Sequence, residues 1–172
     1  MQELELTVDF NGIVIFDPAL LVGYFSGINV GDNLYGRFVS SDEGDRVVSG
    51  GIVLPILGLN DSNYKIILRR AEEPSSVDPG TIIVVNGAFP LKIATKAIIA
   101  DMATLREWSP DQNWHEVSLA PGNYSVNVNG FRKVSEGEVI DFGFELVFEE
   151  RRLLPKFSGS LDKNMQVLEL PS

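Results

Sequence analysis

The chain has 172 residues, a length that fits one domain with a sizeable core, so we expect a single domain over residues 1–172. Acidic residues outnumber lysine and arginine by 24 to 14, and the formal net charge is −10. This charge disfavours direct binding to nucleic acid and favours a basic protein as partner. Cysteine is absent, which excludes disulfides, thiolate metal sites and cysteine nucleophiles.

Targeting and membrane signals are also missing from the sequence. The first segment, MQELELTVDF, has neither the basic nor the apolar region of a signal peptide. No apolar run approaches the ~20 residues of a membrane span, and the densest one, residues 52–59, is interrupted by Pro55 and Gly58. We therefore expect a soluble, cytoplasmic protein with no membrane partner.

The chain begins with a β pattern. Residues 3–10 alternate polar and apolar side chains, which predicts a half-buried strand. Asn11-Gly12 separates this strand from the apolar run at residues 13–16. Because both residues tolerate the positive φ of a type I′ turn, the pattern predicts a β-hairpin.

A short helix and a glycine-rich segment follow. Asp17-Pro18 offers an N-cap and a first helical residue, so we expect a helix of about two turns over residues 19–25. Residues 26–51 are rich in glycine, and we interpret them as a long mobile connection with one strand at residues 34–39. This connection carries an acidic cluster of Asp42, Glu43 and Asp45.

The middle of the chain predicts further short strands. Residues 52–57 and 64–69 are expected to pair around a turn at residues 60–63, and a loop covers residues 72–80. The next expected elements are a strand buried on both faces at residues 81–85, a turn at Asn86-Gly87 and a returning strand at residues 89–93.

The last third contains the clearest alternation. Tyr124, Val126 and Val128 predict one core face, and residues 139–150 predict a strand with an aromatic face and an acidic face. The expected core face carries Ile140, Phe142, Phe144, Leu146 and Phe148, and the expected solvent face carries Asp141, Glu145 and Glu149. Shorter elements are expected at residues 97–100, at residues 102–108 as a helical turn capped by Asp101, at residues 115–119 and at residues 165–170.

These elements together predict an all-β fold. Eight or more short strands separated by turns, with one or two short helices, are typical of an antiparallel β-sandwich of the C2-like or jelly-roll-like kind. A partly open barrel is the alternative.

The stretch WSPDQNW and the residue after it hold both tryptophans, Trp108 and Trp114, and the only histidine, His115. We interpret the stretch as a loop whose tryptophans close the end of a core. The alternative is a carbohydrate or small-ligand site, in which an indole face covers a sugar ring and Asp111, Gln112 and Asn113 bind hydroxyl groups.

Conventional active-site chemistry has little support in the sequence. No G-x-S-x-G surrounds any serine, and no phosphate-binding glycine motif is present. The stretch SSDEGD lacks the ligand order of a calcium loop, so we expect no metal site. Because the catalytic and phosphate-binding motifs are missing as well, we also expect no cofactor and no catalytic residue. A carboxylate-based hydrolase stays open, because two suitably spaced acids suffice for that chemistry.

Residues 87–128 resemble part of the competence protein J type of small acidic bacterial proteins, which inhibit a nuclease. The shared features are a proline-containing strand near Phe89-Pro90, a short connecting segment, and a strand introduced by P-G-x-Y at Pro121–Tyr124. The resemblance covers about a quarter of the chain. It implies a β-sandwich that acts as an inhibitor.

The functional expectation is a non-enzymatic, acidic bacterial interaction protein of an immunity-like or nuclease-inhibitor kind. Its partner would be a basic protein such as a nuclease or toxin, whose phosphate-binding groove the carboxylates would occupy. The expected partner-binding residues are Asp42, Glu43, Asp45, Asp141, Glu145 and Glu149, and those of the ligand-binding alternative are Trp108, Trp114 and His115.

Overall fold

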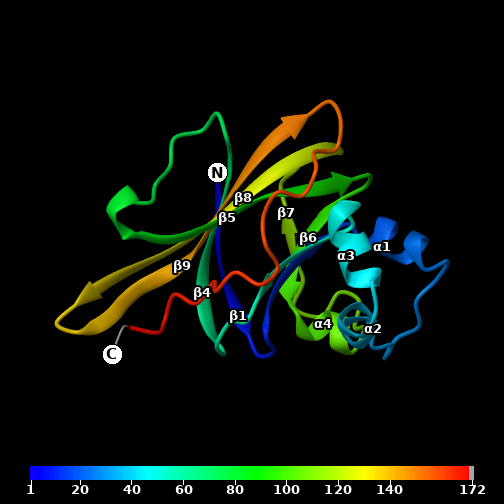
Figure 1. Cartoon of the computed structure of the whole chain (residues 1–172), viewed down its shortest axis with the longest axis horizontal. Coiled ribbons are helices and arrows are strands. Elements are labelled where there is room, and N and C mark those ends of the chain that lie inside the picture. Colours follow the sequence, from blue (N-terminus) through cyan, green and yellow to red (C-terminus); the bar gives the residue numbers. More distant parts are fainter. Residues whose placement is uncertain (171–172) are drawn as a thin grey trace.

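The computed structural model describes residues 1–170, and 44% of the chain lies in strands, which form two sheets (Figure 1). The strands are β1 (Gln2–Val8), β2 (Gly12–Phe16), β3 (Val53–Leu57), β4 (Ser62–Arg70), β5 (Ile82–Ile93), β6 (Ala97–Asp101), β7 (His115–Val117), β8 (Gly122–Ser135) and β9 (Glu138–Arg151). The helices are α1 (Pro18–Tyr24), α2 (Leu34–Ser40), α3 (Glu43–Ser49) and α4 (Ala103–Arg106), with a 3-10 turn η1 (Pro79–Thr81). The expected β-rich fold is confirmed.

The five-stranded sheet has the order β1-β4-β9-β8-β5, and the four-stranded sheet has the order β3-β2-β6-β7. All strand pairs are antiparallel except β4 with β9, which run parallel with Ile66 opposite Phe144. The expectation of purely antiparallel pairing is therefore wrong at this pair. Alternation cannot distinguish the two directions, because successive side chains point to opposite faces in both.

Two predicted hairpins are links between the sheets instead. β1 pairs with β4, whereas β2 pairs with β3 and β6, so Asn11-Gly12 carries the chain from one sheet to the other. β3 and β4 are separated in the same way. Asn11 does adopt a positive φ of 58°, as its turn signal predicts. A turn sequence such as Asn11-Gly12 indicates that the chain bends. Which strand pairs with which is decided by the packing of their apolar faces.

The inner faces of the two sheets share one hydrophobic core. The core includes the side chains that alternation predicted on β8 and β9, which are Tyr124, Val126, Val128, Phe144, Leu146 and Phe148. Ile140 departs from the prediction because it is 56% exposed, and Phe142 is only partly buried. Both lie toward the free end of the β8–β9 hairpin, which projects from the molecule (Figure 1).

A second core lies between the outer face of the four-stranded sheet and the helices. Val14 and Phe16 of β2 pack there against Leu21 and Leu34, while Ile13 and Ile15 enter the first core. β2 is therefore buried along its whole length. The short helix after Asp17 is confirmed, and Asp17 accepts a hydrogen bond from the Ala19 amide at 2.9 Å.

The segment at residues 26–51 forms helices α2 and α3, so the predicted connection and its strand at residues 34–39 are wrong. The Asn33 side chain caps α2 by accepting a hydrogen bond from the Gly36 amide at 2.8 Å. A Cβ at Gly44 would lie 2.3 Å from the Phe38 carbonyl oxygen, so glycine here permits α2 and α3 to approach closely. Gly44, one of the glycines that suggested a loop, is thus a packing position between two helices. Within residues 1–170 no helix has the length and apolar character needed to cross a membrane.

β5 and the C-terminal tail also differ from expectation. β5 runs through the predicted turn at Asn86-Gly87, and Ile83 and Val85 are 44% and 50% exposed, so the prediction of a strand buried on both faces is wrong. Residues 165–170 form no strand. Met165 and Val167 are nevertheless buried in the core between the sheets, because the C-terminal tail runs back across the sheets (Figure 1).

Candidate functional site

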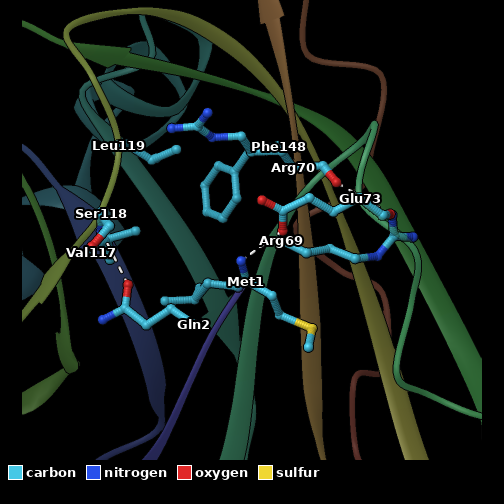
Figure 2. A pocket seen from close by; sticks show the side chains of 10 residues that line it. Met1, Gln2, Arg69, Arg70, Glu73, Val117, Ser118, Leu119 and Phe148 are labelled. Carbon is cyan, nitrogen blue, oxygen red and sulfur yellow. Dashed lines mark hydrogen bonds and ion pairs between the residues drawn. The ribbon is translucent and has the colours of Figure 1, made fainter.

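A cleft of about 340 Å³ opens at one end of the core between the sheets (Figure 2). It lies between β1 and β7, which are edge strands of different sheets. The other walls come from the end of β4, the loop after it and Phe148 of β9. The site is therefore built where the two sheets separate and the core meets solvent.

Gln2 closes the gap between the two edges. Its side-chain amide donates a hydrogen bond to the Glu116 carbonyl at 2.9 Å and accepts one from the Ser118 amide at 3.0 Å. These are the backbone groups that a neighbouring strand would use, so the Gln2 side chain acts as a one-residue strand partner for β7. The cleft consequently has a fixed floor at this side.

Consecutive arginines at the end of β4 serve different faces of the sheet. Because successive side chains alternate, Arg69 points to the outer face and Arg70 to the inner face, level with Phe148. Within the described part of the chain, the Arg70 guanidinium forms no ion pair or hydrogen bond. In Figure 2 it extends over Phe148 toward Leu119.

Arg69 is held by a buried network on the outer face. Its Nε lies 3.1 Å from Glu145 Oε2, and its terminal nitrogen donates to the Glu73 carbonyl at 2.9 Å. Glu145 also accepts hydrogen bonds from Ser75 and, at 2.9 Å, from Asn129. Burial raises the pKa of Glu145. These hydrogen bonds and the Arg69 charge together lower the pKa by more than burial raises it, so the net shift is downward.

This network fixes the loop that roofs the cleft. Ser75 and the Glu73 carbonyl both belong to the loop after β4, so Glu145 and Arg69 bind it at two points. The Glu73 carboxylate reaches into the cleft, where its Oε2 lies 2.8 Å from the Met1 amino group (Figure 2). The hydrogen bond from that amino group lowers the pKa of Glu73.

One wall of the cleft is apolar. Leu68 and Phe148 contribute from the five-stranded sheet, and Val117 and Leu119 contribute from β7 and the segment after it. The cleft therefore places one unpaired guanidinium, Arg70, beside an apolar wall. Such a site suits a ligand that has both a negative charge and an apolar body.

The six predicted partner-binding acids do not form one surface. Asp141, Glu145 and Glu149 share the outer face of the five-stranded sheet, as alternation predicts, whereas Asp42, Glu43 and Asp45 lie at α3 in the helical layer. Glu145 is only 1% exposed, so its prediction as a solvent-facing acid is wrong. Alternation assigned the face correctly, but loop residues after β4 cover that part of the face.

The other two predicted partner-binding acids on β9 are at least partly exposed and are paired with cations. Asp141 lies 2.8 Å from Lys65 Nζ, and Glu149 lies 3.5 Å from the Arg151 guanidinium. Ion pairs of this exposure contribute little to stability. They do reduce the negative charge that this face offers to a partner.

The tryptophan loop packs inward. Trp108 is 3% exposed, and its ring lies 5.4 Å from that of Trp114 and 5.9 Å from that of Phe16. Trp114 is partly buried and donates from Nε1 to the Thr104 hydroxyl at 2.9 Å. The anchoring role is supported by this burial, because a sugar needs an exposed indole face. His115 pairs with Ile99 in the sheet and does not line the cleft.

No metal site is evident in residues 1–170, where no group of three or more His, Cys, Asp or Glu side chains is arranged to hold an ion. Asp101, which was expected to cap the helical turn, accepts hydrogen bonds from the amides of Asp9, Phe10 and Ala103. Burial raises the pKa of Asp101 despite these hydrogen bonds. Its oxygens are therefore engaged in holding the chain together.

The residues that line the cleft share no local pattern in the sequence. Gln2, Arg70, Val117 and Leu119 come from three separate segments of the chain. One signal was present: two successive arginines at the end of an apolar strand must face opposite sides of a sheet, which places one of them on the core side. The proximity of β1 and β7 depends on tertiary packing, and no local pattern in the sequence indicates it.

Comparisons with known proteins support a fold and no family. No protein-family model matches the chain, and no curated protein sequence matches it. A solved structure described as "Crocagin biosynthetic gene J" superposes with a TM-score of 0.53 at 14% identity, covering 87% of this chain and 96% of that one. The resemblance to the competence protein J type is not supported. At this identity the likeness to the crocagin protein concerns the fold alone.

Proposed function

We propose that the protein is a non-enzymatic binding protein whose cleft holds a small organic molecule with a carboxylate and an apolar body. The observation that carries the proposal is the unpaired Arg70 guanidinium beside an apolar wall. A guanidinium offers two parallel donors to a carboxylate, so this charge-assisted pairing is directional. Val117, Leu119 and Phe148 would cover the apolar body.

A binding role fits the lining better than catalysis does. Among the described residues, Glu73 is the only acid that lines the cleft, and its carboxylate is engaged with the Met1 amino group. Hydrolysis of a glycoside by two carboxylates would need a second acid across the same cleft. Ser118 contributes to the lining, but the imidazole that could activate a serine is elsewhere.

The architecture proposed with this function is a β-sandwich with a helical layer on one side. A core cluster that draws side chains from both sheets supports it. The structural neighbour carries a name from crocagin biosynthesis, and a protein in a biosynthetic setting has use for small-molecule binding.

The first prediction concerns Arg70. Titration with 3-phenylpropionate should shift the methyl NMR resonances of Val117 and Leu119. Arg70→Gln should weaken this binding by about tenfold, which is the worth of a charge-assisted hydrogen bond. Arg152→Gln is the matched control, because Arg152 is also exposed but lies outside the cleft.

Two results would contradict the proposal. One is the absence of methyl shifts at Val117 and Leu119 on addition of 3-phenylpropionate. The other is equal weakening by Arg70→Gln and Arg152→Gln, which would mean that the anion responds to overall charge and not to the cleft.

A second candidate function is electrostatic association with a basic protein. The net charge of −10 supports it, as does the exposure of Asp42 and Asp45 at α3. The structure changes its expected details, because Glu145 is buried and the other five acids divide between two faces. A nuclease or toxin stays a proposal for the partner.

A further inference from the structure

A second cavity, of about 280 Å³, lies in the helical layer on the outer side of the four-stranded sheet. Its floor is formed by Val53 of β3, Val47 of α3 and Leu105 of α4, each no more than 2% exposed. Its rim includes Val39 of α2, which is 65% exposed. The cavity is thus an apolar space within a folded layer and is open to solvent on the α2 side.

The polar groups at this cavity are few and carry one sign of charge. Within residues 1–170, Asp45 is the only charged side chain in the lining, and its carboxylate has no ion pair. The Tyr35 hydroxyl accepts a hydrogen bond from the Asn11 side-chain amide at 2.9 Å. Because that bond uses the oxygen as acceptor, the phenol proton is still available to a ligand.

We propose that this cavity binds a small amine with an apolar body. The ammonium group would pair with Asp45 at the rim, and the apolar body would lie on Val47 and its neighbours on the floor. A ligand carboxylate would be repelled by Asp45, and the negative charge of the whole chain raises the local concentration of cations. An apolar pocket with one well-placed charge is the usual form of a small-molecule site.

This site is separate from the cleft in position and in chemistry. The cleft offers Arg70 and therefore suits an anion, whereas the cavity offers Asp45 and therefore suits a cation. No residue lines both. Each proposal can fail without affecting the other.

The test compares three probes of similar shape: 2-phenylethylamine, 3-phenylpropanamide and 3-phenylpropionate. The amine should shift the methyl resonances of Val47 and Val48 and bind more tightly than the neutral amide. Asp45→Asn should weaken amine binding by about fivefold, the upper range for a partly exposed ion pair, and leave amide binding unchanged. Asp42→Asn is the matched control, because Asp42 is an exposed neighbour whose side chain forms no capping bond and does not line the cavity.

The proposal is overturned if the amine produces no shifts at Val47 and Val48. Equal affinity for the amine and the amide would also overturn it, because Asp45 would then contribute nothing. An Asp42→Asn effect as large as that of Asp45→Asn would point to the general field of the protein and would likewise reject the site.

Discussion

At the scale of single residues, Glu145 shows how one carboxylate can lie on the face that alternation predicts and still be buried. It is bound by Arg69, Ser75 and Asn129, and its side chain has almost no contact with solvent. A buried carboxylate in such a network is costly to leave unpaired. Its role is to position Arg69 and the loop that roofs the cleft.

Glu145→Gln should reduce the free energy of unfolding at pH 7 by about 3 kcal/mol, because it leaves Arg69 without its partner. The pKa of Glu145 lies below its ordinary value of 4.5 in the folded protein, so its stabilising effect is fully present above that value. The effect is lost as pH falls through the folded pKa. Urea unfolding at a series of pH values should therefore show the wild type and the variant converging below pH 4.5.

Glu149→Gln provides the control for this measurement. Glu149 lies on the same strand and the same face, but its side chain is 55% exposed and forms an ion pair with Arg151. We expect little change in stability at any pH. A pH-independent difference between Glu145→Gln and the wild type would contradict the assignment.

At the scale of elements, β9 combines a buried half and a projecting half under one sequence pattern. Phe144 is fully buried between the sheets, whereas Ile140 is 56% exposed, although both have the parity of the predicted core face. Only the part of the strand that faces β2 and its neighbours has an apolar layer to cover it. The end of the hairpin projects from the molecule (Figure 1), and Ile140 is exposed there.

Phe144→Ala should therefore lower the free energy of unfolding by about 3–5 kcal/mol, as expected when an aromatic side chain is removed from a packed core. Ile140→Ala on the same strand should change it by less than about 0.5 kcal/mol. Chemical denaturation of both variants measures the difference. Similar losses for the two would mean that the hairpin end is covered in solution.

At the scale of the whole molecule, the charge is large, but the structure divides it. Asp42 and Asp45 lie in the helical layer, and Asp141 and Glu149 lie on the outer face of the five-stranded sheet. These groups cannot contact one small patch of a partner together. If a basic protein binds electrostatically, one of these two pairs of acids should contribute most of the attraction.

Charge reversal can identify that group. We expect the variant pair Asp42→Lys with Asp45→Lys, or the pair Asp141→Lys with Glu149→Lys, to slow association with a basic protein captured from host lysate. The effective pair should also flatten the dependence of the rate between about 50 and about 500 mM salt, because fewer charges steer the encounter. Association that is insensitive to salt and to both pairs would reject the electrostatic candidate.

The sequence alone predicted the β-rich class, the helix after Asp17 and the core faces at Tyr124–Val128 and Phe144–Phe148. These features are local, because period-two alternation and a capping residue act within a few positions of the chain. The inward packing of Trp108 follows from the same reasoning about large apolar side chains.

Only the tertiary structure decided which sheet each strand joins, where α2 and α3 form and how Glu145 is buried. β1 and β2 are separated although Asn11-Gly12 predicts a turn between them, since each strand finds a better apolar partner at a distance. The cleft depends on this choice, because it exists only where β1 and β7 meet and where Gln2 binds the β7 backbone. Strand pairing and burial are set by contacts between residues far apart in the chain, so no local pattern in the sequence contains them.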